Sequence, residues 1–334
     1  MKPLVSAVVI NYNYGRYLAE AVESVLAQDL PSGRLEVIVV DDGSTDDSAE
    51  RIKPYLDRVR WLPKRNGGQV SAFNAGFAAA SGEFVALLEA DDTWEKDKLR
   101  KTLEQFRIEP RAALVQHWLR QVDAGGRPLP GYHYPDGPTR RASVTDIVRG
   151  RLATAGSSSV VFRADALRSF LPFPEEFLFG ADICLRLIAA LSGPVVVVCE
   201  TLGSRRIHGA NLFGATLYDD PVKLGKTLKF YRPQWDYLRA LLARGGSPID
   251  AETNRELDAE YFQMKLFYHR YRGEWGAALG AWASLVRLCG PRPYGAFKAL
   301  SLLLALASPK RFLSAQQAYA SSTLMSWRRR WLPV

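Results

Sequence analysis

FVALLEADD, residues 84–92, is an apolar run that ends in three carboxylates within four residues. The run from Phe84 to Leu88 follows Gly82 and precedes charged residues, which is typical of a buried strand in a mostly parallel sheet. Ligands of open α/β sheets bind just beyond the carboxyl ends of the strands. Carboxylates clustered there repel one another unless a cation lies between them, and Mg²⁺ or Mn²⁺ takes its other ligands from water and substrate phosphates. The stretch therefore predicts a metal-bridged phosphate ester at this strand end.

Strand and helix signals alternate on both sides of this run as far as about residue 215. The expected strands are Val5–Ile10, Leu35–Val40, Val59–Leu62, Phe84–Leu88, Ala112–Leu119, Ser157–Arg163, Val195–Val198 and Ser204–His208. The expected helices are Leu18–Ala27, Asp47–Leu56, Val70–Ala80, Trp94–Arg107 and Asp182–Leu191. A stretch rich in Gly and Pro, 123–141, indicates a loop. This order predicts a three-layer α/β/α domain with a mixed, mostly parallel sheet.

Strand signals stop beyond about Leu217, and Leu228–Leu242, Glu252–Arg272 and Trp275–Leu288 are expected helices. We therefore divide the chain into an α/β domain, residues 1–215, and a helical, basic C-terminal region, residues 216–334.

The net charge of +9 comes mainly from the end of the chain, because no Asp or Glu follows Glu274 while eight Lys and Arg residues do. Trp and Phe residues are interleaved with them, a mixture typical of contact with an anionic membrane surface. Arginines solvated on a helical appendage are the alternative. The longest apolar stretch, Ala299–Ala307, is shorter than the ~20 residues that span a bilayer. Nucleic acid is not an expected partner, since no binding motif accompanies the charge.

The cysteines and the N-terminus bear on the compartment. The three cysteines are scattered without ligand spacing, which argues against a disulfide framework or structural zinc. Met1-Lys2-Pro3 leads directly into a predicted strand and not into a signal-peptide core. We expect a cytoplasmic protein, peripheral on the inner face of the cell membrane through its basic C-terminal region.

Polar clusters follow four of the expected strands at the ligand-binding edge of the sheet. They are Asn11–Gly15, Asp41–Ser44, Asn66–Gln69 with Asn74, and Glu89–Asp92. Each cluster alone is equally compatible with a simple turn, but four at one sheet edge favour a binding site. A carboxylate after the second strand is placed to accept hydrogen bonds from a ribose or base. No GxGxxG follows the first strand, so a metal must hold the phosphates instead.

In combination and order these motifs resemble the family 2 glycosyltransferases of the GT-A fold. Further matching segments are FGAD, residues 179–182, and RIHGAN, residues 206–211, so the resemblance covers residues 4–215. It implies an inverting enzyme that moves a sugar from a nucleoside-diphosphate sugar, UDP favoured, to a hydroxyl of a saccharide or lipid-linked acceptor. Polysaccharide biosynthesis for the cell envelope is the expected setting.

The resemblance also implies roles for individual residues. Those implied to bind the nucleotide-sugar are Tyr12, Asn13, Asp42, Asn66, Gln69, Asn74 and Ala90. Those implied to hold Mn²⁺ or Mg²⁺ on the diphosphate are Glu89, Asp91, Asp92 and His208. Asp182 would be the general base on the acceptor hydroxyl. From the residues alone, Asp182 is also a suitable helix N-cap, and His208 a structural histidine.

Two departures from the family pattern leave an alternative open. Glu89 stands where the family usually has Asp, and Ala181 stands where it often has Glu. A non-catalytic sugar-nucleotide or glycan-binding protein on the same fold is therefore the second hypothesis. A nucleotidyltransferase would need a basic or glycine-rich phosphate loop, which Asn11–Gly15 does not supply. A processive synthase would need membrane-spanning helices.

Overall fold

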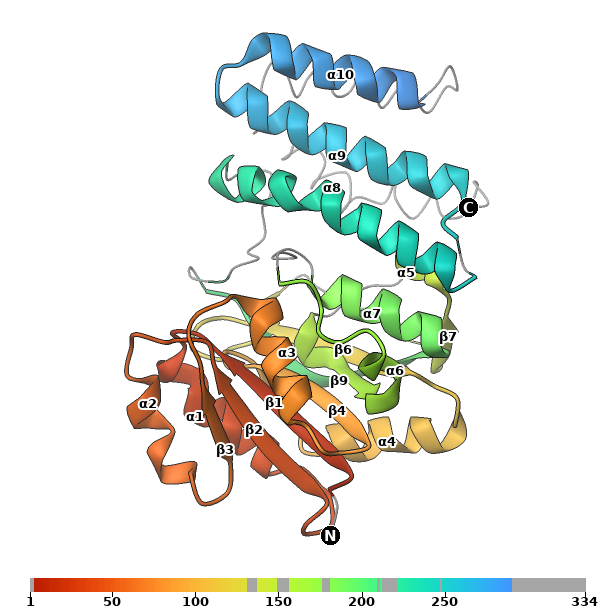
Figure 1. The fold of residues 1–334 in the computed structure, drawn as a ribbon. Helices are drawn as coiled ribbons and strands as arrows, with labels where there is room; N and C mark the ends of the chain where they lie inside the picture. Colours follow the sequence, from red (N-terminus) through yellow and green to blue (C-terminus); the bar gives the residue numbers. More distant parts are fainter. Residues whose placement is uncertain are drawn as a thin grey trace. The chain divides into compact units, whose positions relative to one another are not determined.

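The computed structural model describes residues 3–130, 137–148, 156–175, 181–208, 211, 221–246 and 248–289 (Figure 1). Predictions for the chain beyond residue 289 lie outside this part, as do the centre of the predicted loop and residues 179 and 180. The chain divides into two compact units. The first comprises Met1–Asn211 and Leu238–Pro248, and the second comprises Leu212–Tyr237 and Ile249–Val334.

One mixed, mostly parallel sheet forms the first unit. Within the described residues, nine strands lie in the order β3-β2-β1-β4-β8-β6-β9-β5, and β7 pairs with β9. Their bounds are β1 Val5–Asn11, β2 Leu35–Asp41, β3 Arg60–Pro63, β4 Phe84–Glu89, β5 Thr93–Trp94, β6 Leu114–Val122, β7 Arg140–Ala142, β8 Val160–Arg163 and β9 Val195–Arg206. Strands β1 to β4 are mutually parallel, whereas β8 is antiparallel to both β4 and β6. The predicted fold class is confirmed.

Helices accompany the sheet and make up the C-terminal region. Those of the first part of the chain are α1 Gly15–Leu26, α2 Ser48–Arg51, α3 Gln69–Ala79, α4 Lys98–Ile108, α5 Val144–Val148, α6 Ala164–Arg168 and α7 Ala181–Ser192. Longer helices follow, namely α8 Pro221–Arg244, α9 Ala251–Tyr271 and α10 Trp275–Cys289. Within its described residues, 221–246 and 248–289, the C-terminal region consists of helices and their connections, as predicted. None of the helices in the described ranges is both long enough and apolar enough to cross a bilayer.

Strand β1 is buried along its whole length because helices cover both faces of the sheet (Figure 1). Val5, Ala7 and Val9 share one hydrophobic cluster with apolar residues of α1 and α4. On the opposite face Val8 meets α3 so closely that a Cβ added at Gly76 would lie 2.3 Å from Val8 Cγ1. Burial on both faces explains why the strand is continuously apolar and does not alternate.

Strand β1 is also the point at which the strand order reverses. It pairs in parallel with β2 on one side and with β4 on the other. In register, Asn11 lies beside Asp41 and Ile10 lies beside Glu89. Open α/β sheets bind ligands at the carboxyl side of such a switch point. The fold therefore brings three of the predicted polar clusters to one sheet edge.

Several predicted boundaries were wrong. Trp94 belongs to β5 and not to a helix, because it pairs with Gly203 of β9 and its indole N–H donates to the Ser158 carbonyl at 2.8 Å. The segments Val195–Val198 and Ser204–His208 belong largely to the single strand β9, which ends at Arg206. The predicted helix 47–56 is a short α2 followed by a 3₁₀ turn, Lys53–Tyr55.

Candidate active site

A fixed turn follows β1 at the ligand-binding edge. Asn11 Nδ2 donates to Asp41 Oδ1 at 2.8 Å, which joins the ends of β1 and β2. Asn13 adopts a left-handed φ of 58°, a conformation that asparagine tolerates, and its N–H donates to Ser44 Oγ at 2.8 Å. Tyr12 lies between these anchored residues and is 44% exposed. The turn thus presents an aromatic ring to solvent at the switch point.

Asp42 supports the loop of residues 66–69 through hydrogen bonds. Its carboxylate accepts hydrogen bonds from Lys64 Nζ at 2.7 Å, from the Gly67 N–H at 3.0 Å and from the Gly68 N–H at 2.7 Å. Asn66 Nδ2 donates to the Asp42 carbonyl at 2.8 Å. Asp42 is 3% exposed, so its side chain supports this loop and does not face solvent.

Gln69 and Asn74 belong to α3 but have different surroundings. Gln69 Nε2 donates to Glu89 Oε1 at 2.8 Å, so it lies at the predicted site. Asn74 instead binds the backbone of Phe173, donating to its carbonyl at 2.8 Å and accepting from its N–H at 2.9 Å. Because both ends of its amide are engaged there, the structure does not bring Asn74 to the other predicted residues.

Two of the four predicted metal ligands are held by a serine turn, Ser157–Ser159. Ser157 Oγ donates to Glu89 Oε1 at 2.6 Å. Ser158 Oγ donates to Asp92 Oδ2 at 2.6 Å, while the Arg206 N–H donates to Asp92 Oδ1 at 2.9 Å. Both oxygens of Asp92 are therefore occupied. Ala90 between them is fully buried and donates its N–H to the Ile10 carbonyl at 2.9 Å.

The other two predicted ligands meet each other. His208 Nε2 lies 3.0 Å from Asp91 Oδ2, with the two side chains 2% and 8% exposed. Asn211 Nδ2 donates to the same carboxylate oxygen at 3.1 Å, and the His208 N–H donates to Asn211 Oδ1 at 2.5 Å. The rings of Tyr14 and Tyr17 each lie 5.3 Å from the His208 ring, centroid to centroid. These contacts fix an imidazole and a carboxylate side by side.

The surroundings shift the ionisation of this group of side chains. Burial, followed by the charge of Glu89, raises the pKa of Asp91 to about 7. Burial, followed by the charge of Asp91, raises the pKa of Asp92 to about 7. Burial lowers the pKa of His208, with smaller contributions from nearby arginines. Neutral imidazole is the form that binds a metal, and the lowered pKa of His208 favours that form.

The donor set can be compared with what a divalent cation requires. In the described part of the chain no three His, Cys, Asp or Glu side chains are grouped as a metal site. Asp91 and His208 supply one carboxylate oxygen and one imidazole nitrogen. Mn²⁺ and Mg²⁺ are commonly bound by one or two protein groups together with substrate phosphates and water. The pair therefore fits a cation that is completed by a diphosphate.

Asp182 is the second residue of α7, and its side chain lies outside the described part. The same helix is tied to the serine turn by Arg186, which is fully buried. Arg186 Nε donates to Gln116 Oε1 at 3.0 Å, and its Nη2 donates to the Gly156 carbonyl at 2.8 Å. The helix that carries the predicted base is thus connected to the turn that holds Glu89.

Several residues of the site had no role assigned from the sequence. They are Tyr14, Tyr17, Ser157, Ser158, Arg206 and Asn211. Arg206 and Asn211 belong to the matching segment RIHGAN, so their proximity to His208 was a usable signal. The serines gave no such signal, because only the antiparallel pairing of β8 with β4 brings them to the acidic residues.

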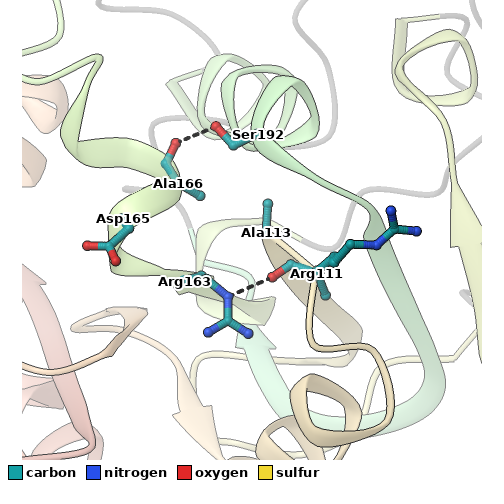
Figure 2. A pocket seen from close by; sticks show the side chains of 7 residues that line it. Arg111, Ala113, Arg163, Asp165, Ala166 and Ser192 are labelled. Atoms are coloured by element: carbon teal, nitrogen blue, oxygen red, sulfur yellow. Dashed lines mark hydrogen bonds between the residues drawn. The ribbon is translucent and has the colours of Figure 1, made fainter.

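A cavity of about 210 Å³ lies elsewhere (Figure 2). It is lined by Arg111, Ala112, Ala113, Arg163, Asp165, Ala166 and Ser192. Arg163 is paired in register with Phe84, the first residue of β4, whereas the acidic residues begin at Glu89, the last residue of that strand. Figure 2 shows two hydrogen bonds at this cavity. Arg163 donates to the Ala112 carbonyl, and Ser192 donates to the Ala166 carbonyl. This cavity is separate from the candidate site.

Comparison with known proteins finds glycosyltransferases and a chondroitin synthase among the relatives of this chain. A family model described as Glycosyl transferase family 2 matches residues 6–169. The chain is 29% identical over 330 residues to an uncharacterized glycosyltransferase of Nostoc sp., covering 96% of this chain and 99% of that protein. It is 36% identical over 157 residues to the putative teichuronic acid biosynthesis glycosyltransferase TuaG of Bacillus subtilis, covering 45% of this chain and 61% of TuaG. It is 34% identical over 213 residues to the Escherichia coli chondroitin synthase, covering 63% of this chain and 30% of that protein.

Solved structures share the fold. S. aureus TarS in complex with UDP-GlcNAc aligns with a TM-score of 0.58 at 20% identity, covering 86% of this chain and 81% of that chain. The mannosyltransferase PcManGT from Pyrobaculum calidifontis, in complex with GDP-Man and Mn²⁺, aligns with a TM-score of 0.54 at 17% identity. That alignment covers 99% of this chain and 88% of the other.

Proposed function

Since residues 6–169 of this chain form a domain of glycosyl transferase family 2, we propose that the protein is a glycosyltransferase that uses a nucleoside-diphosphate sugar, UDP favoured. The acceptor would be a hydroxyl of a saccharide or of a lipid-linked saccharide. The observation that carries the proposal is the Asp91–His208 pair, 3.0 Å apart at the carboxyl side of the switch point. TarS with UDP-GlcNAc and the chondroitin synthase support this choice of donor and acceptor classes.

The donor would lie along the edge formed by the turns after β1 and β4. Tyr12 offers an exposed ring on which a nucleobase can stack, and stacking of this kind is worth about 1–3 kcal/mol per base. Asn13 and the loop 66–69 flank it, with Gln69 next to Glu89. Asp42 would act through the loop that it supports. We leave Asn74 out of the proposed pocket, because its amide is bound to Phe173.

Asp91 and His208 would hold the divalent cation, which would stabilise the charge on the departing diphosphate. Asp91 and His208 would give up the hydrogen bond between them in order to hold this cation. Asp92 would not be a direct ligand, since both of its oxygens accept hydrogen bonds, from Ser158 Oγ and from the Arg206 N–H. Glu89 Oε1 accepts from Gln69 and Ser157, so only its other oxygen could reach a cation.

Asp182 would take the proton from the acceptor hydroxyl as general base. If the base and the diphosphate lie on opposite faces of the sugar ring, the displacement is in line and the anomeric centre inverts. Residues of the serine turn and Arg186 would hold this helix relative to the acidic residues.

The direct test is release of nucleoside diphosphate from UDP-GlcNAc and other UDP-sugars with Mn²⁺, comparing wild type, Asp182→Asn and Asp165→Asn. Loss of a general base lowers the rate by about 10²- to 10⁴-fold, so Asp182→Asn should lose turnover and keep donor binding. Asp165 has a 79% exposed side chain in α6 and serves as the matched control. Equal activity of all three proteins would remove Asp182 from the mechanism.

The C-terminal region would bring the enzyme to an anionic membrane surface, where lipid-linked acceptors are found. Trp275 and Leu279 of α10 are each 50% exposed. The Arg270 guanidinium lies 4.0 Å from the centre of the Trp275 ring. Exposed apolar side chains next to cations are typical of helices that lie on membranes.

A further inference from the structure

Arg206 is a buried cation that reaches three separate parts of the first unit. It is the last residue of β9, is 3% exposed and lies two residues before His208. Its Nε donates to the Asp91 carbonyl at 3.0 Å, and Nη1 donates to the Ala124 carbonyl at 3.1 Å. Its Nη2 donates to Glu20 Oε2 at 2.6 Å. One guanidinium thus joins the acidic residues after β4, the turn after β6 and helix α1.

The aromatic contacts of this guanidinium lead to the same place. Arg206 Cζ lies 4.6 Å from the centroid of the Tyr17 ring, and that ring lies 5.3 Å from the His208 ring. Tyr17 and Glu20 are one turn apart on α1, so they share a helix face. The helix therefore holds Arg206 through charge and ring contact while it supports the imidazole.

The backbone of Arg206 also contacts Asp92 directly and Asp91 through Asn211. Its N–H donates to Asp92 Oδ1 at 2.9 Å. Its carbonyl accepts from Asn211 Nδ2 at 3.1 Å, and the same amide nitrogen donates to Asp91 Oδ2. Displacement of the Arg206 side chain would therefore remove the hydrogen bond to the Asp91 carbonyl. It would also shift the end of β9, which directly precedes His208.

We propose that Arg206 is a positioning residue that keeps Asp91 and His208 close enough to bind one divalent cation. Burying a guanidinium is costly, and a purely structural strand end could be packed with apolar atoms. Groups that orient metal ligands change metal affinity by about 10- to 100-fold when they are removed. The inference rests on the proposed function, because it needs the Asp91–His208 pair to be the cation site.

The test is Mn²⁺ affinity, measured by the electron paramagnetic resonance signal of free Mn²⁺, with Mn²⁺ alone and with UDP. Arg206→Lys should weaken Mn²⁺ binding by about 10- to 100-fold. Arg163→Lys is the matched control, because Arg163 also donates hydrogen bonds to two backbone carbonyls and to one carboxylate, that of Glu83. Arg163 lies at the other end of the sheet. The control variant should bind Mn²⁺ like wild type and lose a similar amount of stability towards urea.

A second variant keeps the test decisive if Arg206→Lys does not fold. Glu20 has a 57% exposed side chain, and Glu20→Gln should weaken Mn²⁺ binding in the same direction by a smaller factor. Unchanged Mn²⁺ affinity in folded Arg206→Lys or in Glu20→Gln would overturn the inference, as would an equal loss in Arg163→Lys. If wild type binds no Mn²⁺ with or without UDP, it is the proposed metal site that fails.

Discussion

Asp91 and Asp92 are adjacent in the chain but have different hydrogen-bond partners. Asp92 is enclosed by Ser158 and the Arg206 N–H, whereas Asp91 shares one oxygen with His208 and Asn211. Which carboxylate of an acidic run faces a ligand depends on the path of the backbone after β4. The sequence therefore predicts the acidic cluster but not the separate roles within it.

Asp92 gives a prediction about pH and stability. Its pKa is raised to about 7 in the folded protein from an ordinary value of 3.8, so the folded state binds more protons than the unfolded state between these values. The free energy of unfolding should therefore fall as pH rises through this window, by up to about 1.4 kcal/mol per unit. Asp92→Asn cannot ionise and keeps one oxygen that can accept from the Arg206 N–H, while its amide N–H would donate to Ser158 Oγ.

We expect the stability of Asp92→Asn relative to wild type to rise by up to about 4 kcal/mol between pH 4 and pH 8. Urea unfolding at both pH values, in EDTA to exclude metal, measures the difference. An equal pH dependence in the two proteins would show that Asp92 does not titrate as described.

At the scale of elements, helix α3 packs against strand β1 at Gly76, which has no side chain. A Cβ at Gly76 would lie 2.3 Å from Val8 Cγ1, and nothing lies within 4 Å of the corresponding position at Gly280 in α10. Gly76→Ala should destabilise the protein by about 1–3 kcal/mol through overpacking. Gly280→Ala should stabilise it by about 0.5–1 kcal/mol, because alanine favours a helix. Urea midpoints of the two variants provide the comparison, and a wild-type midpoint for Gly76→Ala would contradict this packing.

The elements that sequence reasoning predicted best are those whose signal is local. Buried parallel strands such as β1 and β4 are continuous apolar runs that end in polar residues, so their existence and edge position were predictable. Strand β5 and the serine turn were missed, since each depends on a partner more than 60 residues away, Gly203 for Trp94 and Glu89 for Ser157. Long-range pairing leaves no periodic mark on so short a segment.

The same reasoning explains the outcome for the predicted site. The four strand-end clusters were recognisable because a parallel sheet gathers its carboxyl ends at one edge. Asn74 exchanges two hydrogen bonds with the backbone of Phe173, 99 residues later. Nothing in the sequence around Asn74 distinguishes an amide that binds a ligand from one that binds backbone.

At the scale of the whole molecule, the charge distribution predicts that the protein binds an anionic membrane surface. The arginine run 328–330 lies in a segment without acidic residues. Replacing all three by Gln in the full chain should weaken binding to vesicles containing phosphatidylserine by about 3 kcal/mol, since each cation near such a surface contributes about 1 kcal/mol. The matched control replaces the exposed Arg51, Lys53 and Arg58 by Gln. Equal effects of the two triple variants would argue against a specific membrane-binding region.

The central claim is that a nucleoside diphosphate and a divalent cation bind together at Asp91. The most direct measurement is the thermal midpoint with UDP, GDP, CDP or dTDP, each with Mn²⁺ or EDTA, for wild type, Asp91→Ala and the control Asp165→Ala. A ligand at 100 times its Kd stabilises the folded state by about 2.7 kcal/mol. We predict a Mn²⁺-dependent rise with one nucleotide that is lost only in Asp91→Ala. No rise with any nucleotide, or a rise that persists in EDTA or in Asp91→Ala, would contradict the claim.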